Sequence, residues 1–161
     1  MKRLLLLVAL LGIAPSVAAQ ELIVVVRHAE RADATADSPL SAAGEARARR
    51  LADLLKDAGI SRIYTTDLRR TIQTAAPLAD TLHVSASALP AADRAALLTR
   101  VRGSAPHDRL LIVGHSNTVP EILTALGVTE TIAIADAEYD NLFEVVPQPG
   151  GAAPLLVRLR Y

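Results

Sequence analysis

The sequence has no cysteine and no tryptophan, and its 161 residues include only one phenylalanine, three tyrosines and one methionine. Without cysteine the protein cannot form a disulfide, carry a lipid on an N-terminal cysteine or bind a metal through thiolates. Cysteine usage therefore does not indicate whether the protein works in an oxidising or a reducing compartment. Aromatic side chains on which bases could stack are scarce, and no basic face accompanies them. The sequence therefore predicts no nucleic-acid partner.

Only one stretch resembles a targeting or membrane segment, and it lies at the N-terminus. It opens with Lys2-Arg3, continues with apolar residues from Leu4 to Ile13 and ends in Val17-Ala18-Ala19. The apolar part is shorter than the roughly 20 residues that cross a bilayer. We expect residues 1–19 to be a secretory signal peptide, which makes the protein periplasmic or secreted and free of the membrane after cleavage. A hydrophobic first helix or an uncleaved anchor is the alternative.

Residues 20–161 are enough for one domain with its own core. Loss of Lys2 and Arg3 leaves 15 basic against 17 acidic residues, a net charge of −2. Strand-like and helix-like patterns alternate along this domain. Strands are expected at 22–26, 60–66, 82–89, 110–113, 141–146 and 155–160, and helices at 41–58, 68–82 (bent or broken at Pro77), 90–101 and 119–126. This alternation predicts an α/β fold, a mainly parallel sheet with an antiparallel edge hairpin.

Two of the expected buried strands end in a histidine. Leu22 to Val26 runs into Arg27-His28, and Leu110 to Val113 runs into Gly114-His115. Carboxyl ends of parallel strands open on one edge of a sheet, where ligands bind in this fold class. A single histidine there is more often structural, but two at equivalent strand ends, one of them beside an arginine, indicate a site for an anion.

A pair of arginines, Arg69 and Arg70, follows the expected strand at 60–66 at the start of a helix. Successive helical positions point about 100° apart, so the two cannot serve one pocket equally. Spacing alone does not choose between them.

Three motifs together resemble the histidine phosphatase superfamily, also called phosphoglycerate mutase-like. They are Arg27-His28-Ala29-Glu30, the segment Leu68-Arg69-Arg70-Thr71-Ile72-Gln73-Thr74-Ala75, and Val113-Gly114-His115-Ser116-Asn117. The resemblance extends from Leu22 to Val146. It implies a three-layer α/β/α fold and phosphoryl transfer through a phosphohistidine, without a metal or other cofactor.

The same resemblance assigns the central roles and chooses Arg70 over Arg69. His28 is the expected nucleophile, and Arg27, Arg70 and His115 are expected to hold the phosphoryl group. Guanidinium groups suit this task because they stay charged and offer forked donors to phosphate oxygens. The expected substrate is a small phosphorylated molecule or a phosphoprotein.

The acid that protonates the leaving group is harder to place. In the mutase branch of the family this acid is a glutamate that lies in a longer insert after the helix that corresponds to the one with Arg70, and this sequence has no matching insert. Glu121, six residues after His115, is our preferred candidate, and Asp93 is the other; either carboxylate can equally serve a helix N-terminus. Glu30, Arg31 and Asn117 are expected to touch substrate.

Other sequence features give weaker indications of function. Ser116 nearly completes a nucleophile elbow, but no histidine follows His115 to form a triad, which argues against acyl transfer. His83 and His107 adjoin no motif and show no metal-ligand spacing. A non-catalytic module that binds phosphate or a phosphoprotein stays open because the acid is unassigned. A phosphomutase is a third possibility, although the short domain leaves little room for a cover over the site.

Overall fold

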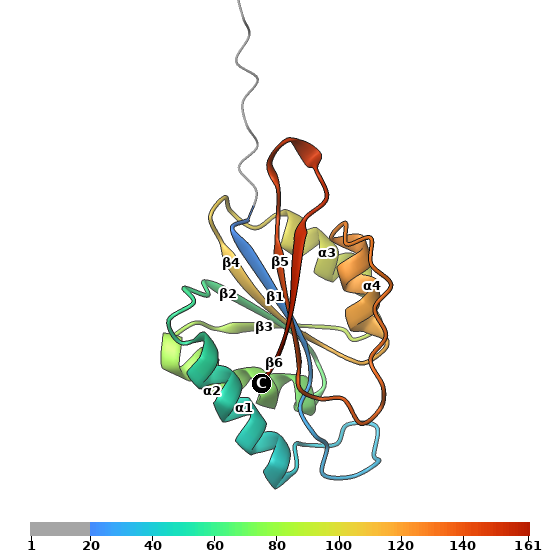
Figure 1. The fold of residues 1–161 in the computed structure, drawn as a ribbon. Coiled ribbons are helices and arrows are strands. Elements are labelled where there is room, and N and C mark those ends of the chain that lie inside the picture. The colour runs from blue at the N-terminus through green and yellow to red at the C-terminus, as the bar shows by residue number, and fades with distance from the viewer. Residues whose placement is uncertain (1–19) are drawn as a thin grey trace, which may run out of the picture.

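The computed structural model describes residues 20–161, which form one six-stranded sheet in the order β3-β2-β4-β1-β5-β6 (Figure 1). The strands are β1 (Leu22–Arg27), β2 (Arg62–Thr66), β3 (Ala86–Leu89), β4 (Arg109–Gly114), β5 (Asn141–Val146) and β6 (Leu155–Arg160). The helices are α1 (Ala42–Leu55), α2 (Arg69–Leu82), α3 (Arg94–Arg102) and α4 (Thr118–Ala125). The signal-peptide prediction lies outside the described residues.

The sheet is mixed, with its parallel part in the centre. Strands β1, β4, β2 and β3 pair in parallel, whereas β5 runs antiparallel to β1 and to the edge strand β6. This arrangement confirms the predicted α/β fold, with a mainly parallel sheet and an antiparallel edge hairpin. A central position explains the continuous apolar sequence of β1, because a strand covered on both faces needs no polar alternation.

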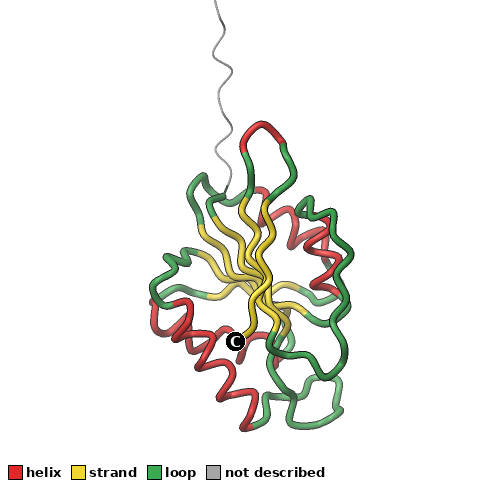
Figure 2. The backbone as a smooth tube through the Cα atoms, viewed as in Figure 1, coloured by secondary structure: helices red, strands yellow, loops and turns green. Residues whose placement is uncertain are grey.

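Helices cover both faces of the sheet and give three layers (Figures 1 and 2). Alternate side chains of β1 divide between two cores: Val25 packs with α3 and α4, whereas Val24 and Val26 pack with α1 and α2. All three are fully buried. Among the described residues, no helix combines the length and apolar character needed to cross a membrane.

Two helices differ from their expected form. Helix α2 continues through Pro77 to Leu82, so the predicted interruption is wrong; Thr74, Ala75 and Leu78 are buried on both sides of the proline, and their packing outweighs the lost backbone bond. Helix α3 begins at Arg94 and not at Pro90, because the Asp93 side chain accepts a hydrogen bond from the Ala96 backbone N–H and caps the helix there.

Candidate active site

The two histidines predicted to share one edge of the sheet do so. Arg27 and Gly114 are paired neighbours on β1 and β4, and the backbone N–H of His28 donates to the Gly114 carbonyl over 2.9 Å. The imidazole centroids of His28 and His115 lie 5.3 Å apart with a 62° angle between the rings. The residues are only 4% and 8% exposed, so both rings lie at the floor of the site.

A backbone contact fixes the proton on the His28 ring. Its Nδ1 lies 2.7 Å from the carbonyl oxygen of Ala29. A carbonyl can only accept, so Nδ1 carries the hydrogen and, in the neutral ring, Nε2 keeps its lone pair. Nε2 is therefore the nitrogen of His28 that can act as a nucleophile.

His115 is oriented by two polar neighbours. Its Nε2 lies 3.2 Å from the hydroxyl oxygen of Thr66, at the end of β2, and its Nδ1 lies 3.5 Å from Nη2 of Arg70. Arginine has only donors, so Nδ1 is the accepting nitrogen and Nε2–H donates to Thr66. The ring is thus held beside Arg70 in one tautomer.

Arg27 joins the end of β1 to the loop between α4 and β5. Its Nη1 donates to the carbonyl oxygens of Ala135, Asp136 and Glu138 at 2.9–3.0 Å, and its guanidinium carbon lies 4.0 Å from the ring centroid of Tyr139. One edge of the guanidinium is therefore occupied by protein. Its remaining N–H groups are what Arg27 can offer to an anion.

Arg70 reaches the site from the first turn of α2. Its Nη1 donates to the carbonyl of Ala36 at 2.8 Å, and its Nη2 faces His115. The carboxylate of Asp37 accepts from the backbone N–H of Arg69 at 2.8 Å, so the loop after β1 also caps α2, whose own N-cap residue Leu68 has no capping side chain. These contacts hold the helix end at which Arg70 enters the site.

An open pocket of about 450 Å³ lies above the two imidazoles. Its lining is largely polar and includes three arginines, Arg27, Arg31 and Arg70, together with both imidazoles, Ser116, Asn117 and one carboxylate residue, Asp136. Burial and the neighbouring guanidiniums of Arg31 and Arg27 lower the pKa of Arg70. Such clustering of positive charge is unfavourable by itself and becomes favourable when an anion binds.

Burial keeps both imidazoles neutral. Desolvation, opposed by the hydrogen bond to Ala29 and aided by His115, Arg70 and Arg27, lowers the pKa of His28 to about 3. Desolvation, together with Arg70 and Arg27, lowers the pKa of His115 to about 4. Near neutral pH the His28 ring is therefore in the form that a nucleophile requires.

These lowered pKa values predict a pH dependence of stability. The unfolded chain binds protons on histidine below about pH 6.5, whereas folded His28 does not, so the free energy of unfolding falls as the pH falls below that value. Between pH 7 and pH 5 this group alone contributes a loss of about 2 kcal/mol. We expect urea unfolding at the two pH values to show a drop that is smaller by about that amount in His28→Asn. An equal drop in both proteins would contradict the inferred burial of a neutral ring.

Three predicted site residues do not line the pocket. The Glu30 carboxylate forms a two-pronged ion pair with Arg47, 2.7 Å at its shortest, so it joins the end of β1 to α1 and does not face the pocket. A Cβ atom at Gly44 would collide with the Glu30 carbonyl, which shows how closely α1 approaches there. The Glu121 carboxylate, half exposed, pairs with Arg94 one helix away.

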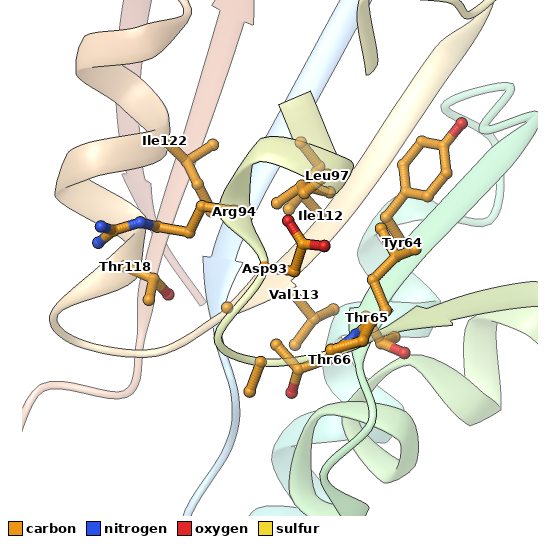
Figure 3. Close-up of a pocket in the computed structure, with 14 residues that line it drawn as sticks. Tyr64, Thr65, Thr66, Asp93, Arg94, Leu97, Ile112, Val113, Thr118 and Ile122 are labelled. Carbon is orange, nitrogen blue, oxygen red and sulfur yellow. The ribbon is translucent and has the colours of Figure 1, made fainter. Parts of the chain in front are cut away.

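Asp93 lies instead at a second, much smaller cavity between α3, α4 and the sheet (Figure 3). This cavity has a volume of about 20 Å³, space for about one water molecule, and its walls are apolar side chains such as Leu97 and Ile122. It meets the larger pocket at Ala91 and Thr118, which line both. The Asp93 carboxylate caps α3, the structural role that competed with its assignment as an acid.

Arg31 and Asn117, which were predicted to touch substrate, line the pocket, and three contributors to the site were not predicted. Thr66 ends β2, the parallel neighbour of β4, so the strand-end argument used for the histidines applies to it as well. Asp136 and Tyr139 belong to an irregular loop that carries no periodic signal. In the described part of the chain, no group of three or more His, Asp or Glu side chains is arranged to hold a metal ion.

Comparison with known proteins agrees with this geometry. Residues 23–93 match the model of the histidine phosphatase superfamily (branch 1). A curated protein, the probable phosphoglycerate mutase GpmB of Enterobacter sp. (strain 638), is 44% identical over 62 residues, which cover 34% of this chain and 29% of that protein. The matched part thus spans less than a third of the curated relative.

Solved structures match over most of the chain. The putative phosphohistidine phosphatase SixA of Agrobacterium tumefaciens has a TM-score of 0.66 and 18% identity, covering 88% of this chain and 98% of that one. A protein histidine phosphatase SixA complexed with tungstate has a TM-score of 0.65 and 22% identity, covering 86% and 96%. A mycobacterial glucosyl-3-phosphoglycerate phosphatase has a TM-score of 0.65 and 15% identity, covering 88% and 98%. At these identities the likeness shows the fold alone.

The described domain matches the histidine phosphatase superfamily: its residues 23–93 fit the family model, and it has the fold of the solved phosphatases named above.

Proposed function

We propose that this protein is a phosphatase that hydrolyses phosphomonoesters or phosphoramidates through a phosphohistidine on His28. One observation carries the proposal. The Nδ1–H of His28 is held by the Ala29 carbonyl, which leaves an unprotonated Nε2 at the floor of a pocket lined by Arg27, Arg70 and His115. Nucleophile and anion-binding groups therefore face the same space.

The proposed first step forms a bond between Nε2 of His28 and phosphorus while the bond to the leaving group breaks. Negative charge spreads over the three equatorial oxygens in this transition state, so positioning and electrostatic stabilisation carry most of the catalysis. The guanidiniums of Arg27 and Arg70 and the ring of His115 supply that stabilisation. In the second step water attacks the phosphohistidine, the electron pair returns to Nε2, and phosphate leaves.

The test is a screen of diverse substrates with detection of the covalent intermediate. We expect phosphate release from at least one of an aryl phosphate, alkyl phosphates, a phospho-amino acid and a phosphohistidine peptide. Both ester and phosphoramidate substrates are included because the structural neighbours carry names of both kinds. Rapid alkaline quenching and mass spectrometry should find the phosphoryl group on His28. Turnover should persist in EDTA, because the positive charge that this mechanism needs comes from arginine side chains.

Two other results would assign a different function. Tight binding of inorganic phosphate without any turnover would indicate a phosphate-binding module. Transfer of the phosphoryl group back to a second position of the substrate, without phosphate release, would indicate a mutase. We also propose that residues 1–19 direct export; N-terminal sequencing of the protein recovered from the periplasm or medium, beginning at Gln20, tests this.

A further inference from the structure

The mechanism needs a proton for the leaving oxygen, and the described carboxylates around the site are largely committed elsewhere. Glu30 pairs with Arg47, and Glu121 pairs with Arg94. Asp93 caps α3, and the Asp67 carboxylate accepts from the backbone N–H of Ala91 at 3.0 Å. None of these four residues lines the pocket that contains the two imidazoles.

Asp136 is the one carboxylate residue among the described residues that line this pocket. It belongs to the loop between α4 and β5, and its backbone is fixed there because Nη1 of Arg27 donates to its carbonyl at 2.9 Å. The turn is closed by two further hydrogen bonds, from the Glu138 N–H to the Ala135 carbonyl and from the Ala135 N–H to the Glu138 carboxylate, both 2.9 Å. Arg27, which directly precedes the proposed nucleophile His28, thus holds this turn beside the site.

The side of the pocket on which Asp136 lies also fits a proton donor. Phosphoryl transfer places the attacking and leaving atoms roughly in line. His28 is buried at the floor, so the leaving group departs toward the mouth of the pocket, and Asp136 is an exposed member of the pocket lining.

We propose that Asp136 is the general acid and base of the reaction, an inference that rests on the proposed phosphatase function. In the first step its carboxyl O–H passes a proton to the leaving oxygen as the bond between that oxygen and phosphorus breaks. In the second step the resulting carboxylate takes a proton from the attacking water, and phosphate is released from His28. Asp136 ends the cycle protonated.

The experiment measures how the rate depends on the leaving group. Wild type and Asp136→Asn are compared on p-nitrophenyl phosphate, phenyl phosphate and β-glycerophosphate. The leaving oxygen becomes more basic in this order, so its departure depends more and more on protonation. We expect Asp136→Asn to lower kcat/KM for β-glycerophosphate by about 10²-fold and for p-nitrophenyl phosphate by less than about threefold. The matched control is Glu130→Gln, a carboxylate of the same loop outside the pocket, which should change neither rate.

The outcomes separate this proposal from the phosphatase function. Equal losses on all three substrates, or no loss, would overturn the role of Asp136 while leaving the phosphatase proposal intact. The role also fails if Glu121→Gln, and not Asp136→Asn, shows the leaving-group dependence. If wild type neither turns over any substrate nor forms phosphohistidine, the phosphatase proposal itself fails. Unchanged affinity of Asp136→Asn for inorganic phosphate shows that the pocket is still folded.

Discussion

Replacing His28 by asparagine is expected to lower kcat/KM by at least about 10⁴-fold and to abolish the phosphoenzyme, because the variant has no nucleophile in reach of phosphorus. Asparagine is the preferred replacement because its side-chain amide can still donate near the Ala29 carbonyl, to which the Nδ1 of His28 donates. Steady-state phosphate release and mass spectrometry of quenched enzyme are the two measurements. Binding of inorganic phosphate should survive, since Arg27 and Arg70 remain.

The matched control is His83→Asn. His83 ends α2 in the left-handed conformation, with φ of 54°, which asparagine tolerates better than most residues. It does not line the pocket, so its replacement should leave both turnover and labelling unchanged. Persistent labelling of His28→Asn, with the phosphoryl group on another residue, would show that the nucleophile is wrongly assigned.

The second large effect is expected at Arg70. Arg70→Ala removes a donor aimed at the site beside His115 and should lower kcat/KM by about 10³-fold. Arg70→Lys should recover only part of this loss, because an ammonium keeps the charge but cannot contact two phosphate oxygens with a planar fork. Steady-state kinetics on one aryl phosphate measures all the variants.

Arg69→Ala supplies the comparison from the adjacent position. Arg69 is exposed and does not line the pocket, and its bond to Asp37 uses the backbone N–H, which alanine keeps. We expect a change of less than about twofold. Similar losses in Arg69→Ala and Arg70→Ala would mean that both arginines act only through their positive charge at the start of α2, and that Arg70 has no specific contact with phosphate.

The buried strands and the residues that end them were predictable because they depend on local sequence. Five apolar residues before Arg27-His28 and four before Gly114-His115 place both histidines at strand ends whatever the loops do. The choice of Arg70 over Arg69 was different, since spacing left it open and the family resemblance decided it. The reason for the glycine at position 114 could not be read from the local sequence: a Cβ atom there would lie 3.0 Å from the Thr118 hydroxyl and 3.2 Å from the Val119 side chain of α4.

The carboxylates could not be assigned from the sequence, because their roles depend on partners that lie far away along the chain. Glu30 is held by Arg47 on α1, and Glu121 lies one turn beyond the pocket-lining Thr118, where it meets Arg94 of α3. Asp136 lies in a loop without periodicity, and only its attachment to Arg27, more than 100 residues away, brings it to the site. Long-range contacts of this kind leave no local pattern.

Strand order also determines when the active centre can assemble. Both hydrogen-bonded neighbours of β1, the strands β4 and β5, follow it after a long interval; the paired residues Leu22 and Arg109 are 87 positions apart in the sequence. A nascent chain that has emerged as far as β3 already contains His28 and Arg70 but offers β1 no strand to pair with. Contacts this distant in sequence slow folding and leave apolar segments exposed during synthesis. Ribosome-bound or prematurely terminated chains should therefore be inactive and dependent on chaperones, and catalytic competence should arise only when the last third of the polypeptide joins the sheet.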